Sequence, residues 1–168
     1  MQRLMIWRHA KAVQWSPERN DFSRALQPVG TQHAQWVAEW LLQNLAAPEQ
    51  ILCSPSQRTR ETLAPLLLLC PPLAAVTRFI PQLYLAPGDI LESCLDAAFA
   101  ESGSVMIVGH NPGLERLVRE VIHQRHYDEY QGLPTGTLAV IDFTLDWPEI
   151  RGRGQLSHLI RGKNLSVD

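Results

Sequence analysis

The sequence predicts an α/β fold: a three-layer α/β/α sandwich around a mostly parallel central sheet with an antiparallel strand. Short apolar runs alternate with longer stretches in which apolar residues recur every three or four positions. This is the pattern of buried strands alternating with amphipathic helices. Near the C-terminus two apolar runs, residues 137–143 and 155–160, follow each other without a long helix between them, so we expect them to pair antiparallel.

The first half of the chain predicts two strands, each followed by a helix. Residues 4–7 and 50–53 are short apolar runs typical of buried strands. Residues 30–46 place apolar side chains on one face of a helix and polar ones on the other. After the second strand, Ser54 as cap and Pro55 at the first helical position predict a helix to about residue 70, bent at Pro65.

The second half continues the alternation. We expect a third strand at residues 74–80, a helix at 89–100, a buried strand at 104–108 and a helix at 113–122. Asn111 and Pro112 resemble a second cap-then-proline helix start. No internal repeat or linker interrupts the pattern, so one domain spanning residues 1–168 is expected.

Composition excludes several classes of protein. Fifteen basic and 17 acidic residues give a net charge of -2 and are spread along the chain, which argues against binding to nucleic acid or to a membrane surface. Three cysteines without a CxxC motif favour a reducing compartment over a disulfide framework. The apolar runs are too short for a signal peptide or a membrane span. We therefore expect a cytoplasmic protein.

Three polar clusters follow predicted strands. Arg8 and His9 follow the first, residues 54–58 follow the second and end at Arg58, and His110 lies in the Gly109–Gly113 segment that follows residues 104–108. In open parallel sheets, ligands bind beyond the carboxyl ends of the strands. We therefore expect two histidines and two arginines to share one crevice.

These clusters resemble the motifs of the histidine phosphatase superfamily, whose fold is phosphoglycerate mutase-like, and specifically its SixA-like phosphohistidine phosphatases. Three motifs occur in the family's order, each at a strand end, and the resemblance spans most of the chain. The segments that carry it are Trp7-Arg8-His9-Ala10-Lys11-Ala12, Ser54-Pro55 with Arg58, Arg60 and Thr62, Leu83-Tyr84, residues 109–113, and residues 134–139.

The resemblance implies that His9 is a nucleophile, Arg8 and Arg58 bind phosphate, and His110 is a second active-site histidine. It implies hydrolysis of phosphohistidine on a protein, a phosphotransfer domain or carrier, through a phosphohistidine intermediate on His9, without cofactor or metal. We expect a monomer, and we expect Asn111 to help bind the phosphate. The roles agree with physical chemistry, because neighbouring guanidiniums lower the pKa of His9 and present forked donors to phosphate.

The sequence departs from the wider superfamily in two ways. Ala10 stands where most members have glycine. No acidic residue matches the proton donor that other branches supply to an alcohol leaving group; Asp89 and Glu92 lie in about the right stretch but in the wrong context. An imidazole leaving group needs less help from such a donor, which favours phosphohistidine over sugar phosphates.

Several alternatives stay open. The chain could hydrolyse small phosphate monoesters, or it could bind phosphoproteins without turnover. His123 and His126 have a spacing that could suit a metal, but no carboxylate or cysteine completes a set, and a helix-end pair is the better interpretation. Lys11 and Arg24 could border the pocket and attract an anionic substrate, or could be solvated charges. Residues 21–24 resemble the family's second loop, with no role assigned.

Overall fold

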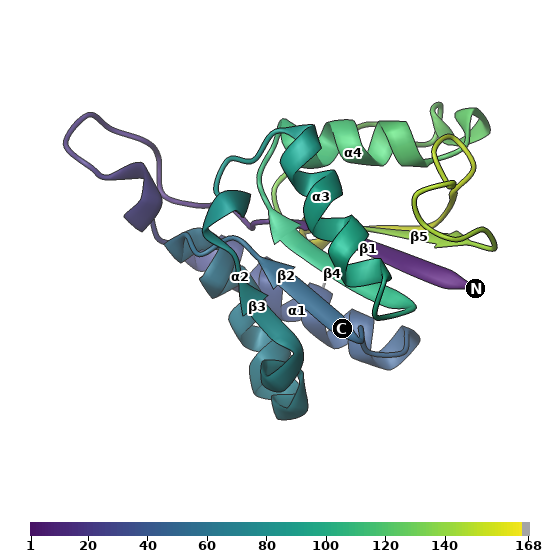
Figure 1. Cartoon of the computed structure of the whole chain (residues 1–168). Helices are drawn as coiled ribbons and strands as arrows, with labels where there is room; N and C mark the ends of the chain where they lie inside the picture. Colours follow the sequence, from purple (N-terminus) through teal and green to yellow (C-terminus); the bar gives the residue numbers. More distant parts are fainter. Residues whose placement is uncertain (166–168) are drawn as a thin grey trace.

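The computed structural model describes residues 1–165 and is built on a six-stranded sheet with the order β3-β2-β4-β1-β5-β6 (Figure 1). Strands β1 to β4 pair parallel, whereas β5 runs antiparallel to both β1 and β6. The expected mostly parallel sheet with an antiparallel strand is therefore confirmed. The strands are β1 (Gln2–Arg8), β2 (Gln50–Cys53), β3 (Thr77–Phe79), β4 (Ser104–Gly109), β5 (Thr137–Phe143) and β6 (Gln155–Arg161).

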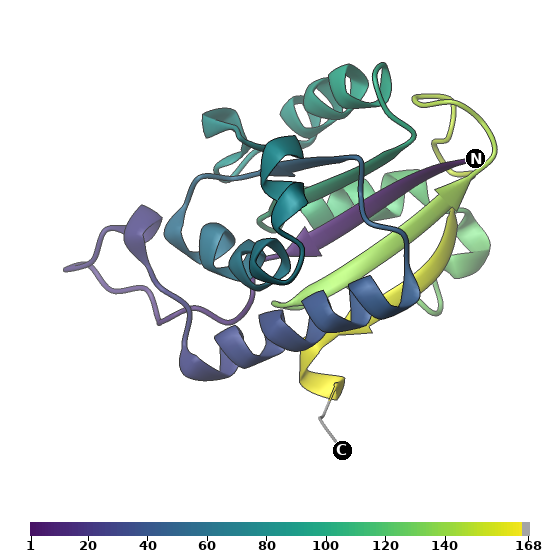
Figure 2. The same ribbon diagram turned by 90° about the horizontal axis from the view of Figure 1, so that it is seen from below.

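Helices cover both faces of the sheet (Figures 1 and 2). On one face, α1 (Pro28–Asn44) and α2 (Gln57–Leu69) pack over a core that includes Trp7, Leu41 and Leu66. On the other, α3 (Gly88–Phe99) and α4 (Gly113–Val121) enclose a second core around Ile6 and Leu117. Alternate residues of β1 thus enter different cores, which is why residues 4–7 of the strand are all apolar.

Two elements differ from the sequence-based expectation. Helix α2 begins at Gln57 and not after a Ser54 cap, because the Ser54 N–H donates to the Val108 carbonyl (3.0 Å) and extends the sheet pairing beyond β2. The third strand is short because a 3-10 helix, η2 (Pro71–Val76), takes up the first three residues of the segment expected to be extended. The prolines at its start favour a turn of helix over a strand.

The segment between β1 and α1 projects from the body of the molecule, at the left of Figure 1. We call residues 13–25 the arm. Its base is closed by a bridge between Ala12 and Leu26, and by the Val13 N–H, which donates to the Ala25 carbonyl (2.9 Å). A short 3-10 helix, η1 (Asp21–Ser23), lies near its return to the body. None of the helices in the described part of the chain is long and apolar enough to cross a membrane.

Candidate active site

The three polar clusters meet at the carboxyl ends of β2, β4 and β1, which are neighbours in the sheet. The His9 N–H donates to the Gly109 carbonyl (3.1 Å), and the Gly136 N–H donates to the His9 carbonyl (2.9 Å). The backbone of His9 is therefore held between two neighbouring segments. The ring centroids of His9 and His110 lie 5.4 Å apart.

The ring of His9 is fixed in one tautomer. Its Nδ1 lies 2.8 Å from the Ala10 carbonyl oxygen, and because that oxygen can only accept, Nδ1 carries the proton. In the neutral ring, Nε2 then holds a lone pair. Burial, followed by the charges of Arg58 and Arg8, lowers the pKa of His9 to about 4, although the Ala10 hydrogen bond opposes the shift. Burial is thus a larger cause than the guanidiniums that the sequence analysis invoked.

The ring of His110 is fixed in the opposite tautomer. An Arg58 Nη2 donates to its Nδ1 (3.2 Å), so the ring proton is on Nε2 and is donated to the Ser54 Oγ (2.8 Å). Burial, and then the charge of Arg58, lowers the pKa of His110 to about 3. Tyr84 meets the ring edge-on, with centroids 5.5 Å apart. Both histidines are therefore uncharged at neutral pH.

Arg58 is the buried cation of the site. Its side chain is only 2% exposed and leaves the first turn of α2. Nη1 donates to the Asp21 carbonyl (2.8 Å), while Nη2 donates to the Asp21 carboxylate (3.2 Å) and to His110. A buried charge is tolerated only when it is paired and hydrogen-bonded, and the arm supplies the pairing for Arg58, whose Nε alone is buried without a partner.

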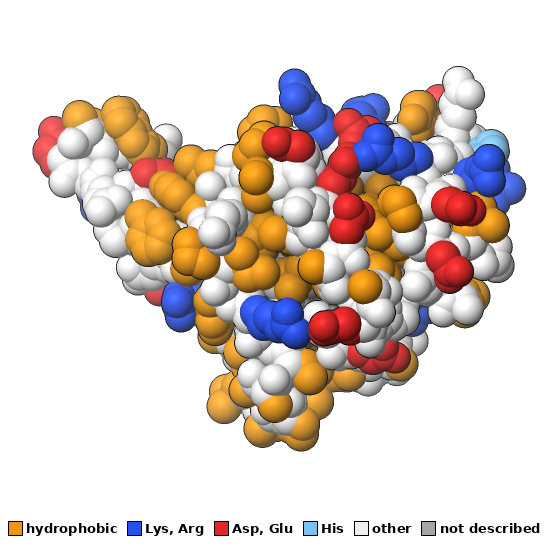
Figure 3. All heavy atoms as spheres, viewed as in Figure 1, with side chains coloured by type: hydrophobic (Ala, Val, Ile, Leu, Met, Phe, Trp, Pro, Cys, Tyr) orange, Lys and Arg blue, Asp and Glu red, His pale blue; other side chains and the backbone are white. Residues whose placement is uncertain are grey.

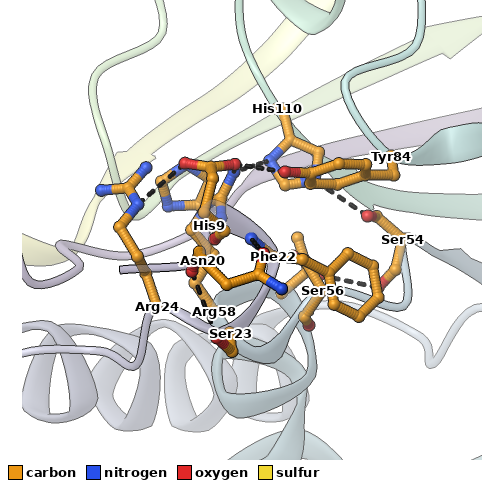
Figure 4. Close-up of polar contacts among 12 residues, drawn as sticks. His9, Asn20, Phe22, Ser23, Arg24, Ser54, Ser56, Arg58, Tyr84 and His110 are labelled. Atoms are coloured by element: carbon orange, nitrogen blue, oxygen red, sulfur yellow. Dashed lines mark hydrogen bonds and ion pairs between the residues drawn. The ribbon is translucent and has the colours of Figure 1, made fainter. Parts of the chain in front are cut away.

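Asp21 is a member of the site that sequence reasoning left without a role. Its carboxylate accepts from Arg24 Nε (2.9 Å), from Arg58 and from the Tyr84 hydroxyl. Tyr84 lies beside the ring of His110 (Figure 4). Partial burial opposes ionisation, but the hydrogen bond from Tyr84 and the charges of Arg58 and Arg24 outweigh it, so the pKa of Asp21 is lowered. The likeness of residues 21–24 and of Leu83-Tyr84 to family segments was the signal available in the sequence.

Arg8 and Asn111 both reach the loop that precedes β5. Arg8 Nη1 donates to the Leu133 carbonyl (3.0 Å), and its Nε is buried without a partner. The Asn111 amide donates to the same carbonyl (2.9 Å) and to Glu115, and its Oδ1 accepts from the Glu115 N–H. The side chain of Asn111 is thus bound to α4 and to this loop. The other four predicted site residues lie together: Arg58 contacts His110, the ring of His110 lies near that of His9, and the charge of Arg8 helps to lower the pKa of both histidines.

Arg8 and His9 border a cleft of about 530 Å³, which is large enough for a phosphate and part of the group that carries it, whereas Arg58 and His110 are buried and do not line it. Arg8, His9, Lys11, Arg24, His33 and Lys163 are among the residues that line it. Within residues 1–165, no three His, Cys, Asp or Glu side chains are grouped so that they could hold a metal ion. His123 accepts from the Arg125 N–H, as expected of a helix-end residue, and Glu92 pairs with Arg151.

The geometry suits transfer of a phosphoryl group. An uncharged imidazole nitrogen can attack phosphorus, and guanidinium groups beside it stabilise the negative charge on the phosphoryl oxygens. A site without a metal can catalyse this reaction by positioning and by fixed charges alone.

Known proteins resemble the chain over most of its length. The structure of a candidate phosphohistidine phosphatase SixA from Agrobacterium tumefaciens is 30% identical, with a TM-score of 0.80 and coverage of 95% of this chain and 97% of that one. A protein histidine phosphatase SixA complexed with tungstate is 25% identical, with a TM-score of 0.75 and coverage of 98% and 99%. An uncharacterized protein of Mycobacterium tuberculosis is 28% identical over 157 residues, 85% of this chain and 90% of the relative. No family model matches the chain.

Proposed function

Because the chain belongs to the histidine phosphatase superfamily, among its SixA-like phosphohistidine phosphatases, we propose that it hydrolyses phosphohistidine on a protein through a covalent intermediate on His9. The observation that carries this proposal is the tautomer of His9. The bond from Nδ1 to the Ala10 carbonyl leaves the Nε2 lone pair available, and the lowered pKa keeps the ring uncharged at neutral pH.

The reaction has two displacements. The Nε2 lone pair of His9 forms a bond to phosphorus, and the phosphorus–nitrogen bond of the substrate breaks with its electron pair on the departing imidazole, which takes a proton from solvent. Water then attacks phosphorus, the bond to His9 breaks, and inorganic phosphate leaves as the water proton is lost. Dividing hydrolysis in this way replaces one difficult step with two easier ones.

Arg58 and Arg8 stabilise the phosphoryl oxygens in both displacements. Arg58 is held in place by Asp21 and His110, and Arg8 by the Leu133 carbonyl, so neither guanidinium has to be ordered when substrate binds. Preorganised charge of this kind contributes more than a flexible surface charge would. Loss of a single such donor costs roughly a hundredfold to a thousandfold in kcat.

The ionised state of Asp21 supports phosphohistidine as the substrate. An alcohol leaving group requires a proton donor, whereas the Asp21 carboxyl, which contacts Arg58, has a lowered pKa and is charged at neutral pH. A phosphorylated imidazole departs more easily than an alkoxide. Comparable turnover of sugar phosphates and of a phosphohistidine protein would contradict this assignment and would favour a small-molecule phosphomonoesterase.

Trapping the intermediate tests the proposal. The purified protein is mixed for milliseconds with a ³²P-labelled phosphohistidine peptide and quenched in alkaline detergent, which preserves phosphohistidine. Label should appear on His9 in the wild type and be lost, together with turnover, in His9→Ala. His123→Ala is the matched control, because His123 is an exposed histidine outside the site, and it should label normally. Unchanged labelling of His9→Ala would exclude His9 as the nucleophile.

A further inference from the structure

The cleft continues past His9 to two lysines and a histidine that the proposed reaction does not use. The histidine is His33; burial, and then the charge of Lys11, lowers its pKa, so at neutral pH it offers a ring N–H rather than a charge. Lys11 lies two residues after His9, His33 lies on α1, and Lys163 lies on η5 (Gly162–Asn164), the 3-10 helix after β6. These three residues come from distant parts of the sequence. They line the same cleft as Arg8 and His9.

Close packing at glycines brings these segments together. A Cβ at Gly30 would lie 2.1 Å from the Lys11 carbonyl oxygen, so only glycine lets the backbone of Lys11 rest on α1. A Cβ at Gly162 would lie 2.6 Å from the Cβ of His33, so η5 rests on α1 in the same way. Lys11, His33 and Lys163 therefore start from backbone positions that are held against one helix.

The charge in this cleft contrasts with that of the whole chain. The chain has a net charge of -2, and Figure 3 shows acidic and basic side chains interspersed over α3 and α4. The residues that line the cleft include Arg8, Lys11, Arg24 and Lys163 but neither Asp nor Glu. In residues 1–165, neither lysine takes part in an ion pair. Cations concentrated in a cleft attract an anionic ligand more strongly than cations scattered over a surface do.

We propose that Lys11, His33 and Lys163 form a second anion-binding subsite, which takes the carboxylates of acidic residues beside the phosphohistidine of a protein substrate. The inference rests on the proposed function and extends it, because it specifies which phosphorylated proteins the site prefers. The phosphoryl group binds at Arg8 and Arg58, and the flanking carboxylates bind further along the cleft.

The surface beside the cleft carries an exposed aromatic side chain and a second hollow. Trp15 on the arm is 62% exposed, and it lines a further hollow of about 570 Å³ together with Val13 and Pro28. Val29, the residue after Pro28, lines the cleft itself. An exposed tryptophan on a projecting segment is a typical anchor for a protein partner. A small metabolite would leave this second hollow unused.

Two synthetic peptides of equal length test the subsite. Each carries one phosphohistidine, flanked in one peptide by glutamates and in the other by glutamines. For the wild type we expect kcat/KM to be about tenfold higher on the glutamate peptide, mainly because its KM is lower. This preference should shrink in 0.5 M salt, since salt screens exposed charges. In the Lys11→Gln/Lys163→Gln double variant the ratio between the two peptides should fall to about one. Arg116→Gln, which replaces an exposed arginine of α4, is the matched control and should keep the wild-type ratio.

The outcomes separate this inference from the proposed function. Equal turnover of both peptides by the wild type would overturn the subsite and leave the phosphatase assignment intact. Absence of turnover on both peptides would overturn the proposed function. The subsite is therefore also tested without catalysis, by measuring the binding of the same peptides in unphosphorylated form by fluorescence anisotropy. Tighter binding of the glutamate peptide that the double variant loses supports the subsite, whereas equal binding overturns it. A preference confined to small phosphate esters that bear a carboxylate would also overturn the assignment to a protein substrate.

Discussion

The reactivity of the site is decided by a few hydrogen bonds between single residues. The Ala10 carbonyl fixes the proton of His9 on Nδ1, while Arg58 fixes that of His110 on Nε2. The two rings are chemically alike but present different nitrogens. A histidine displaced from the Ala10 carbonyl would lose the preference for the tautomer that directs Nε2 at phosphorus.

Arg58→Lys should lower kcat/KM by roughly a hundredfold to a thousandfold, the scale of losing an oriented charge donor. A single ammonium cannot reproduce the planar fork with which Arg58 contacts the Asp21 carbonyl, the Asp21 carboxylate and His110. Steady-state kinetics on a phosphohistidine peptide and on p-nitrophenyl phosphate measure the effect. Arg60→Lys, an exposed neighbour on the same helix, is the control. Near-wild-type kinetics for Arg58→Lys would remove Arg58 from the phosphate site.

Elements position the site through close backbone contacts. Helix α1 supports the segment after β1 at Gly30, and the arm returns to the body so that Asp21 reaches Arg58 on α2. The Ala10 N–H also donates to the Thr62 Oγ1 (2.9 Å), which ties the same segment to α2. The position of His9 therefore depends on two helices as well as on its own strand.

Gly30→Ala should destabilise the fold and reduce activity together. The new Cβ would lie 2.1 Å from the Lys11 carbonyl oxygen, a backbone atom, so residues 10–12 must move away from α1. We expect a loss of about 1–3 kcal/mol in the free energy of unfolding, the usual cost of overpacking, measured by urea denaturation, together with a lower kcat.

Gly88→Ala is the matched control, because Gly88 also lies in the first turn of a helix but a Cβ there meets nothing within 4 Å. Alanine is the better helix former, so Gly88→Ala should be neutral or slightly stabilising. If Gly30→Ala proved as stable and as active as Gly88→Ala, the contact between α1 and Lys11 would not position the site.

At the scale of the whole molecule, the fold buries two imidazoles in their uncharged forms. His9 is 7% exposed and His110 4%, with pKa values of about 4 and about 3. In the unfolded chain both histidines titrate near 6.5. Between these values and 6.5 the unfolded state binds more protons than the folded state does, so folding stability falls as the pH decreases through this window.

The free energy of unfolding should therefore decrease between pH 6.5 and pH 5, with each histidine contributing up to about 1.4 kcal/mol per pH unit at the acidic end of this range. Urea denaturation at a series of pH values measures the slope. His110→Gln should have a visibly shallower slope than the wild type, because one of the two groups no longer titrates. Identical slopes for the wild type and His110→Gln would show that His110 is not held uncharged.

The sequence by itself determined the fold class and which residues are chemically important. Apolar runs and helical periodicity depend on local patterns, so the order of strands and helices could be predicted. The antiparallel pairing of β5 and β6 followed from the absence of a long helix between them. The strand-end positions of Arg8, His9, Arg58 and His110 were equally local features. The predicted start of α2 at Ser54 and Pro55 was wrong, because a hydrogen bond from Ser54 to the distant Val108 keeps this residue extended.

Only the tertiary structure decided what surrounds these residues. The contact of Asp21 with Arg58 and Tyr84, the tautomers of the two histidines, and the meeting of Lys11, His33 and Lys163 in one cleft join segments far apart in the chain. No local pattern encodes such contacts, because they depend on how helices pack on the sheet and on which side chains that packing removes from water. Burial, the largest cause of the lowered pKa values of His9 and His110, arises in the same way.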